Sequence, residues 1–382
     1  MDARQLISGL LHAYYRNATA IAPDQIEKRE FAFGTFDAKI AARHLSFADE
    51  EHLRKYLVEN VPLHVSYSQA YYERPAERPM ENKGWLGAEL IFDLDATELR
   101  LPCQAVHGTE WVCSNCFASV KEEALKLIED FLIPDFGFSE KDLEINFSGN
   151  RGYHVHIKRK ELLELDSEAR REITSYIAGA NLDFSELFPT VGQRGKMLRG
   201  PTPDTPGWGG KIARSFIGKL EKGPEALMAV GIDARLARML YRKRALIEMG
   251  IKNGNWDMVY IRNKAEFWSN IINREKIAIS DAIDRNVTTD TSHLIRLPNS
   301  IHGGTGLIAK RIASIHDLER FEPMKDAIAF REGSLKVRIS KADAFTMNGE
   351  TFGPYDNAEA VLPEYAAVYL YLKGRAAIVD SV

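Results

Sequence analysis

The sequence predicts an α/β protein whose core mixes short strands with helices. Residues 88–95 alternate between two faces, as a half-buried strand does, and residues 143–147 and 153–157 form two more strand-like runs around a short turn. Between these strands, apolar side chains recur at helical spacing over residues 119–132, and Pro134 ends the pattern. Strands and helices therefore alternate along the chain, as expected for mixed sheets flanked by helices.

The middle of the chain differs in pattern from both ends. After Lys160, helical periodicity dominates two stretches, 161–180 and 221–283, with polar and Pro/Gly-rich connections. We therefore expect one discontinuous core into which a mainly helical subdomain is inserted. The expected bounds are 1–160 and 281–382 for the core, and 161–280 for the subdomain.

The other elements follow from local signals. An amphipathic helix is expected from Ala3 to Arg16, with Asp2 as its N-cap, and another helix should close the chain from Leu362 to Gly374. Residues 73–85 carry two prolines and many charges and are expected to form a loop. Further strands are expected at residues 30–33, 63–67, 284–297 and 306–309.

The composition excludes several classes of protein. Of 382 residues, 45% are hydrophobic and 27% charged, which is the mixture of a globular chain and not of a disordered or fibrous one. No apolar run approaches the ~18–20 residues of a membrane span, and the N-terminal helix lacks the apolar stretch of a signal peptide, so a cytoplasmic location is expected. The net charge of −4 excludes a uniformly basic nucleic-acid-binding surface but leaves room for a local basic groove.

Two aspartates mark one face of the strand at 88–95. Asp93 and Asp95 are two residues apart, so both carboxylates point the same way. Adjacent carboxylates repel each other, and hard oxygen ligands of this kind suit Mg²⁺ or Mn²⁺, which in pairs support phosphoryl or nucleotidyl transfer. The alternative is a solvated strand face without function, because the pattern is short and common.

The cysteines indicate a second metal site. All three lie in one segment, with the spacing Cys103-x3-His107-x5-Cys113-x2-Cys116. An odd number of cysteines in a chain expected to be cytoplasmic argues against a disulfide framework, whereas four N/S ligands match a closed tetrahedral zinc site. Four protein ligands leave no position for a catalytic water, so we expect a structural zinc knuckle. The alternative is three reduced thiols and a surface histidine.

A turn and a later loop contain groups suited to phosphate. The turn SGNRG at 148–152 carries Arg151 between glycines, and His154 and His156 share one face of the following strand. Residues 284–287 and 293–306 add an acid, two arginines, two histidines and three glycines. A metal-bound triphosphate is bound by such a combination, in which a carboxylate holds the metal and cationic side chains contact the phosphates. The alternatives are a solvated hairpin and a glycine-rich surface loop.

Taken together and in this order, the motifs resemble those of the small catalytic subunit of archaeal and eukaryotic DNA primase. The resemblance spans nearly the whole chain. It rests on FDLDAT (92–97), the Cys/His segment (103–116), SGNRGYHVHI (148–157) and HLIRLPNSIHGGTGL (293–307), with REFAF (29–33) and LPEYAAVYLYLKGRA (362–376) as further matches. The chain departs from the family in having Asn150 where a basic residue is frequent, Arg296 where some members have lysine, and a histidine in the knuckle.

The resemblance implies a primase-type catalytic core and a role for particular residues. Asp93, Asp95 and the downstream Asp284 would be the catalytic residues and hold two Mg²⁺ or Mn²⁺ ions, and the knuckle would hold a structural Zn²⁺. The residues implied to bind the nucleotide are Ser148, Arg151, His154, Arg296 and His302 at the triphosphate, His293 near the sugar and base, and Arg43, which would also face the triphosphate.

The activity implied is the synthesis of short RNA primers, and possible DNA primers, on single-stranded DNA from nucleoside triphosphates at the start of replication. Its implied partner is a large subunit with an iron–sulfur cluster, which must be a separate chain because three cysteines cannot hold such a cluster as well as zinc. An archaeal cytoplasmic replisome is the implied setting. Two basic clusters, 158–160 and 242–244, are candidate DNA contacts or simply solvated surfaces.

Three other functions share part of this pattern. A primase-like repair polymerase would extend primers or gapped ends and would differ in its preference for ribose or deoxyribose. A non-catalytic zinc-containing nucleic-acid-binding module would need the knuckle but not three acids. A metal-dependent nuclease or phosphatase would use the carboxylates without a triphosphate pocket.

Overall fold

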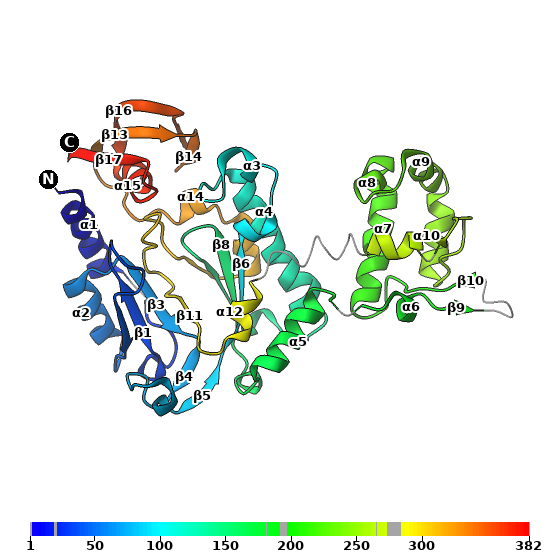
Figure 1. The fold of residues 1–382 in the computed structure, drawn as a ribbon, viewed down its shortest axis with the longest axis horizontal. Helices are drawn as coiled ribbons and strands as arrows, with labels where there is room; N and C mark the ends of the chain where they lie inside the picture. Colours follow the sequence, from blue (N-terminus) through cyan, green and yellow to red (C-terminus); the bar gives the residue numbers. More distant parts are fainter. Residues whose placement is uncertain are drawn as a thin grey trace. The chain divides into compact units, whose positions relative to one another are not determined.

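The computed structural model describes residues 2–18, 21–180, 182–191, 197–264, 266–272 and 284–381. It confirms a mixed α/β protein (Figure 1). Two compact units can be distinguished, and each is described by itself. The first consists of Met1–Leu125, Ser139–Arg171 and Ala282–Val382, and the second of Lys126–Phe138 and Glu172–Asp281.

One antiparallel sheet of the first unit has the strand order β11-β3-β1-β2. Tyr56 of a neighbouring helix packs on Phe33 of this sheet, with ring centroids 4.5 Å apart. The elements are α1 (Ala3–Asn17), β1 (Phe31–Gly34), β2 (Ala42–Leu45), α2 (Glu50–Asn60), β3 (His64–Ser68) and β11 (Leu294–Arg296). The predicted first helix is confirmed: Asp2 caps it by accepting from the Arg4 N–H.

A second antiparallel sheet has the order β12-β7-β8-β6 and carries the motif strands. Phe117 of α4 packs on Phe147 of this sheet, with ring centroids 6.2 Å apart. The elements are β6 (Leu90–Asp95), α4 (Ser114–Lys126), β7 (Leu143–Phe147), β8 (Gly152–Ile157) and β12 (Arg311–Ile312). The strands predicted at 88–95, 143–147 and 153–157 are therefore present, and α4 continues as a π-helical turn, Leu127–Leu132.

A third sheet, β16-β13-β17, lies at the C-terminus with α15 packed against it (Figure 1). It consists of β13 (Ser334–Ala342), β16 (Tyr355–Pro363) and β17 (Ala376–Ser381), and α15 is Glu364–Leu372. The other elements outside the second unit are β4 (Ala70–Tyr72), β5 (Trp85–Ala88), α3 (Gln104–His107), α5 (Ser167–Ile177, which continues into the second unit), α12 (Arg285–Thr289), α13 (Ile315–Arg320), α14 (Pro323–Asp326), β14 (Phe345–Met347) and β15 (Glu350–Phe352).

The second unit is mainly helical in the part that the structure describes. Its core is aromatic: the ring of Trp256 lies 5.0 Å from Phe188 and 4.7 Å from Trp268. The elements are α6 (Phe184–Leu187), β9 (Thr190–Val191), β10 (Met197–Leu198), α7 (Trp208–Lys222), α8 (Pro224–Ala229), α9 (Ala234–Arg242) and α10 (Arg244–Lys252). Of the helical stretch expected at 221–283, residue 265 and residues 273–283 lie outside the described residues.

Three sequence expectations differ from the structure. The strand expected over 284–297 begins instead with a short helix, α12, and only Leu294–Arg296 form a strand, β11, because the Asp284 side chain accepts from the Asn286 N–H and starts a helical turn. Residues 306–309 make only isolated β-bridges, Ile301 with Ile308 and Leu307 with Ile328. The closing helix begins at Glu364 and not at Leu362, because β16 runs to Pro363.

None of the helices in the described part of the chain combines the length and the apolar character that a membrane span requires.

Candidate active site

The three predicted aspartates lie in the first unit, at the edge of the sheet formed by β6, β8, β7 and β12. Asp93 and Asp95 alternate with buried residues along β6, and their backbone partners on β8 are His154 and Gly152. The backbone N–H of Asp284 donates to the Asp93 carbonyl at 2.8 Å. This hydrogen bond ties the start of α12 to the strand that carries the other two acids (Figure 1).

The surroundings of the Asp93 carboxyl raise its pKa to about 7. Burial is the largest cause, and the charges of Asp95 and Asp284 act in the same direction. Its side chain is 24% exposed, and its Oδ1 lies 3.6 Å from His154 Nε2. The three acids are therefore close enough to repel one another, which favours either a shared proton or a cation between them.

Asp95 faces a cation of the protein itself. Arg151 Nε lies 2.9 Å from its carboxylate, whose Oδ1 also accepts from the backbone and hydroxyl of Thr97, each at 2.8 Å. Arg151 Nη1 in turn reaches the Thr109 carbonyl at 3.5 Å and the Glu110 carboxylate at 3.6 Å. Arg151 thus connects the aspartate strand with the segment that carries the cysteines.

The turn 148–152 owes its shape to one serine and two glycines. Ser148 Oγ accepts from the backbone N–H groups of Asn150 at 3.3 Å and Gly152 at 3.1 Å. A Cβ on Gly152 would lie 2.0 Å from the Leu94 carbonyl, so only glycine permits this close pairing with β6. Gly149 has φ +78°, and a Cβ there would lie 2.7 Å from His302 Cβ. The turn therefore sits directly against the loop that carries His302.

His302 is held in one tautomer by its own loop. Its Nδ1 accepts from the Gly304 N–H at 3.1 Å, which leaves Nε2 as the protonated nitrogen of the neutral ring. Thr305 Oγ1 donates to the Gly149 carbonyl at 2.5 Å and joins this loop to the turn. Burial, followed by the charge of Arg296, lowers the pKa of His302 well below its usual value, so the free protein presents a neutral donor here.

Arg296 acts electrostatically on residues of both the β11-β3-β1-β2 sheet region and the β12-β7-β8-β6 sheet. It stands on β11, and its Nη1 donates to the Val65 carbonyl at 3.4 Å. Burial lowers its pKa to about 10. The pKa of His154 is lowered well below its usual value by burial, by His156 and by Arg296. Arg296 is therefore near both His154 and His302.

Arg43 and His293 lie on the side of the site formed by the other sheet. Arg43 Nε donates to Glu30 Oε1 at 2.7 Å, and the Arg43 side chain is 35% exposed. The pKa of His293 is lowered by burial and by Arg43, and raised by Asp290 and Asp284. His293 thus lies within electrostatic range of Arg43 and of Asp284.

Several polar residues of this region have no individual role in the sequence prediction. His156 Nδ1 pairs with the buried Glu89 at 2.8 Å, and Glu89 also pairs with the buried Arg29, whereas His156 Nε2 is buried without a hydrogen-bond partner in the described part of the chain. His64 lies beside His302, with ring centroids 6.1 Å apart. Lys373 reaches the turn from the C-terminal end of α15. Arg29, His156 and Lys373 lie within motifs of the sequence analysis, whereas nothing in the sequence singled out Glu89.

The Cys/His segment gathers its four possible ligands as the spacing predicts. One ligand atom from each of Cys103, His107, Cys113 and Cys116 lies within 4.8 Å of all the others, and the three thiols are free. His107 Nδ1 donates to the Gly108 carbonyl at 2.7 Å, so Nε2 keeps its lone pair, 3.7 Å from Cys116 Sγ. This set could hold a metal such as zinc, and it is the one group so closely gathered in the described ranges.

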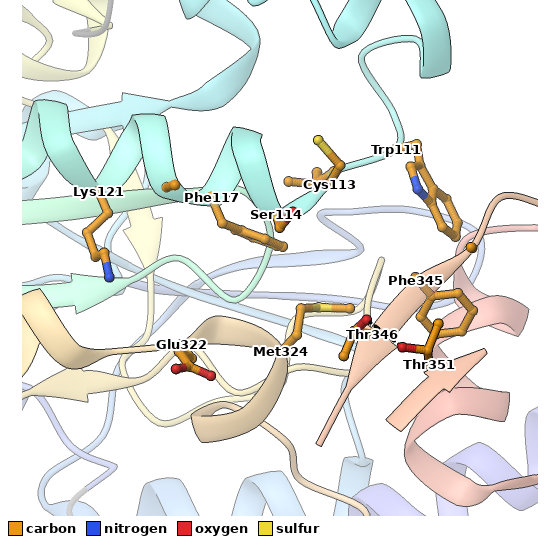
Figure 2. A pocket seen from close by; sticks show the side chains of 13 residues that line it. Trp111, Cys113, Ser114, Phe117, Lys121, Glu322, Met324, Phe345, Thr346 and Thr351 are labelled. Carbon is orange, nitrogen blue, oxygen red and sulfur yellow. Dashed lines mark hydrogen bonds between the residues drawn. The ribbon is translucent and has the colours of Figure 1, made fainter. Parts of the chain in front are cut away.

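A pocket beside this segment contains none of the predicted catalytic or nucleotide-binding residues. It lies between α4, α14 and the β14–β15 hairpin, and Trp111, Phe117, Met324 and Phe345 make its lining largely apolar (Figure 2). Trp111 also packs on Tyr369 of α15, with ring centroids 5.8 Å apart. The pocket is therefore separate from the open site at the carboxylates.

The two basic clusters differ in how far their charges are neutralised. Lys158 pairs with Glu144 at 2.9 Å, and Arg159 with Glu161 at 3.2 Å, whereas Lys160 is exposed. Residues 242–244 of the second unit are all exposed, and Arg244 lies over the Tyr241 ring at 4.5 Å.

Comparison with known proteins identifies relatives along nearly the whole chain. The family model described as DNA primase small subunit matches residues 92–314. A protein of Methanothrix thermoacetophila named DNA primase small subunit PriS is 37% identical and covers 96% of both chains. Proteins of the same name from Methanosarcina acetivorans (35% identical, 98% of this chain and 97% of that protein) and Archaeoglobus fulgidus (35%, 95% and 95%) are also similar.

Proposed function

The chain belongs to the DNA primase small subunit family, and from this premise we propose that it is the catalytic subunit that makes primers on single-stranded DNA. The reaction is the template-directed joining of nucleoside triphosphates, with RNA as the primary product. The main support for this proposal is that Asp93, Asp95 and Asp284 lie close together beside the turn 148–152. In such an enzyme the acids that bind the metal ions lie next to the cations that bind the phosphates.

The carboxylates suit two Mg²⁺ or Mn²⁺ ions. The donor set consists of hard oxygens, and burial, followed by the charges of Asp95 and Asp284, raises the pKa of Asp93, so the ionised form of Asp93 would be favoured by a bound cation. When bound, such ions would lower the pKa of the attacking 3′-hydroxyl and neutralise the leaving pyrophosphate. Asp93, Asp95 and Asp284 would hold them, and no protein nucleophile is required.

The other residues have separate tasks in binding the nucleotide. Arg151 and Arg296 would supply positive charge and bidentate hydrogen bonds to the triphosphate. His302 would donate from Nε2, since its Nδ1 is already occupied by the Gly304 N–H. Ser148 shapes the turn, and its hydroxyl proton remains available to a phosphate oxygen. His154 and Arg43 would complete the triphosphate site, and His293 the site of the sugar and base.

The knuckle of Cys103, His107, Cys113 and Cys116 would hold one structural Zn²⁺. Its three sulfur donors and one imidazole nitrogen match a closed tetrahedral site. A separate large subunit with an iron–sulfur cluster would be the partner in a heterodimer, in the cytoplasm of an archaeal cell. Copurification of this partner with a tagged chain, followed by iron analysis, would test that assignment.

Primer synthesis tests the function directly. The purified chain, alone and with its partner, is incubated with single-stranded DNA, labelled ribo- or deoxynucleotides, and Mg²⁺ or Mn²⁺. Short products made without a supplied primer, and absent from Asp93→Asn/Asp95→Asn, support the proposal. Extension of supplied primers alone would favour the repair polymerase, and cleavage of the template a nuclease. DNA binding without any reaction would favour a zinc-containing binding module.

A further inference from the structure

Lys373 brings a cation to the turn 148–152 from the opposite end of the chain. It follows the last residue of α15, and its Nζ donates to Asn150 Oδ1 at 3.4 Å and to the Glu110 carbonyl at 3.0 Å. Asn150 belongs to the turn itself, and Glu110 precedes Trp111 in the Cys/His segment. The ammonium therefore lies where these two segments meet, next to Arg151.

The packing around Lys373 holds it in this position. Its Nζ lies 5.9 Å from the ring centroid of Tyr369, one helical turn earlier in α15. Tyr369 packs on Trp111 at 5.8 Å and on Phe345 at 5.6 Å. Trp111 and Phe345 thus hold the ring of Tyr369, and this ring together with the two hydrogen bonds of Nζ restricts the Lys373 side chain before a ligand binds.

The charge of Lys373 lacks a carboxylate partner among the described residues. Both of its acceptors are neutral oxygens, and the nearby Glu110 carboxylate lies 3.6 Å from Arg151. The pKa of Lys373 is lowered to about 8. Burial is the largest cause and the charge of Arg151 acts in the same direction, whereas the charges of Glu110 and Asp95 raise the pKa. A half-buried ammonium beside an arginine is unfavourable by itself and is stabilised when an anion approaches both.

We propose that Lys373 binds a phosphate oxygen of the nucleic-acid substrates beside Arg151, so that the C-terminal helix completes the phosphate site. The proposal rests on the proposed function, which supplies the phosphate. Two sources carry the same chemistry: the triphosphate of an incoming nucleotide and the backbone of the DNA strand. The position at the turn 148–152, whose Ser148 and Arg151 are assigned to the triphosphate, favours the incoming nucleotide.

Lys373→Gln is the most informative variant, because glutamine removes the charge but keeps a donor for the Glu110 carbonyl and Asn150. Lys373→Arg restores the charge. Lys341→Met, on the exposed face of β13, is the matched control for loss of one C-terminal lysine. Dissociation constants are measured for ATP with Mg²⁺ in the absence of template, for adenosine, and for single-stranded DNA.

Loss of a charge-assisted hydrogen bond is expected to raise the Kd for ATP about tenfold in Lys373→Gln. Lys373→Arg should recover most of the affinity, and Lys341→Met and the adenosine Kd should not change. An increase confined to the Kd for DNA would support the phosphate contact and assign it to the strand. Unchanged Kd values for both ligands, at an unchanged Tm and zinc content, would overturn the inference.

Failure of this inference can be distinguished from failure of the proposed function. Primer synthesis by the unsubstituted chain is measured in parallel. If that chain makes primers and Lys373→Gln binds ATP and DNA normally, only the role of Lys373 is wrong. If the unsubstituted chain neither binds ATP nor makes primers, the proposed function is wrong and the inference falls with it.

Discussion

The two candidate metal centres of the first unit differ in how their residues come together. The Cys/His centre takes all its ligands from residues 103–116, and they are gathered within 4.8 Å. The aspartate centre joins Asp93 and Asp95 to Asp284, which follows the segments of the second unit in sequence, and its members repel one another. A metal bound by ligands from one short segment can add its binding free energy to the stability of the fold. Like charges brought together from distant segments lower that stability, and such a cluster is suited to binding a cation.

The largest effect is expected from removing the aspartates. Asp93→Asn/Asp95→Asn should lower primer synthesis by about 10³-fold or more, because a transition state rich in negative charge loses its cations. Zinc content should remain that of the unsubstituted chain. Glu98→Gln, an exposed acid just beyond β6, is the matched control and should keep normal activity. Equal activity in the double variant and the control would refute the assignment of the catalytic acids.

Loss of the Cys/His centre should affect stability first. Cys113→Ser/Cys116→Ser should release zinc and destabilise the first unit by several kcal/mol, on the order of 3 kcal/mol or more. Activity should fall less than in the aspartate variant, since the Thr109 and Glu110 contacts to Arg151 are weakened but the acids remain. Zinc analysis with thermal unfolding checks this. A variant that keeps its Tm would show that the centre is not structural.

Arg151 contacts Asp95 of the aspartate centre and also Thr109 and Glu110 of the Cys/His segment. Arg151→Gln removes the partner of Asp95 and a cation of the phosphate site. We expect KM for nucleoside triphosphates to rise by about 10- to 100-fold, the range for losing a charge-assisted bidentate contact. Arg338→Gln, an exposed arginine paired with Glu359, serves as the control. An unchanged KM would remove Arg151 from the triphosphate site.

The last expected effect is a gain in stability that depends on pH. Because the pKa of Asp93 is raised to about 7 in the folded chain, the folded state keeps a proton that the unfolded state loses near pH 4. Stability should therefore decrease as pH rises from about 4 to 7. Asp93→Asn should remove this decrease, so its gain in unfolding free energy over the unsubstituted chain should grow over that range to on the order of 4 kcal/mol and then level off.

Denaturant unfolding at pH 4.5 and pH 8, without added divalent ions, measures this difference. A constant difference between Asp93→Asn and the unsubstituted chain at both pH values would show that the charged form of Asp93 is not disfavoured in the folded chain. Growth of the difference with pH would show that the folded chain loses stability when this carboxyl is ionised.

The sequence predicted local features more accurately than features that depend on distant contacts. The knuckle ligands, the common face of Asp93 and Asp95, and the capped first helix all follow from spacing along one short segment. The helix after Asp284 was mistaken for a strand, because a single capping side chain decides between the two over so few residues.

Long-range contacts explain the remaining differences. The C-terminal sheet of β13, β16 and β17 is not among the sequence predictions, although polar and buried apolar residues alternate over 334–339 of β13, and the strands that pair with β13 come from later segments. From the sequence, Lys373 is only one residue of the segment 362–376 that matches the primase family. Nothing in the neighbouring sequence indicates that the Lys373 side chain reaches Asn150. The pairing of His156 with Glu89 likewise depends on the register between β6 and β8.

Binding of Mn²⁺, followed by electron paramagnetic resonance, tests the central claim most directly. The zinc-loaded chain is titrated with Mn²⁺ in the presence of a non-hydrolysable nucleoside triphosphate, alongside Asp93→Asn/Asp95→Asn. We expect two Mn²⁺ per chain in the unsubstituted protein, a loss of this binding in the double variant, and one Zn²⁺ in both. Equal Mn²⁺ binding by the two proteins would contradict the claim that these aspartates form the catalytic metal centre.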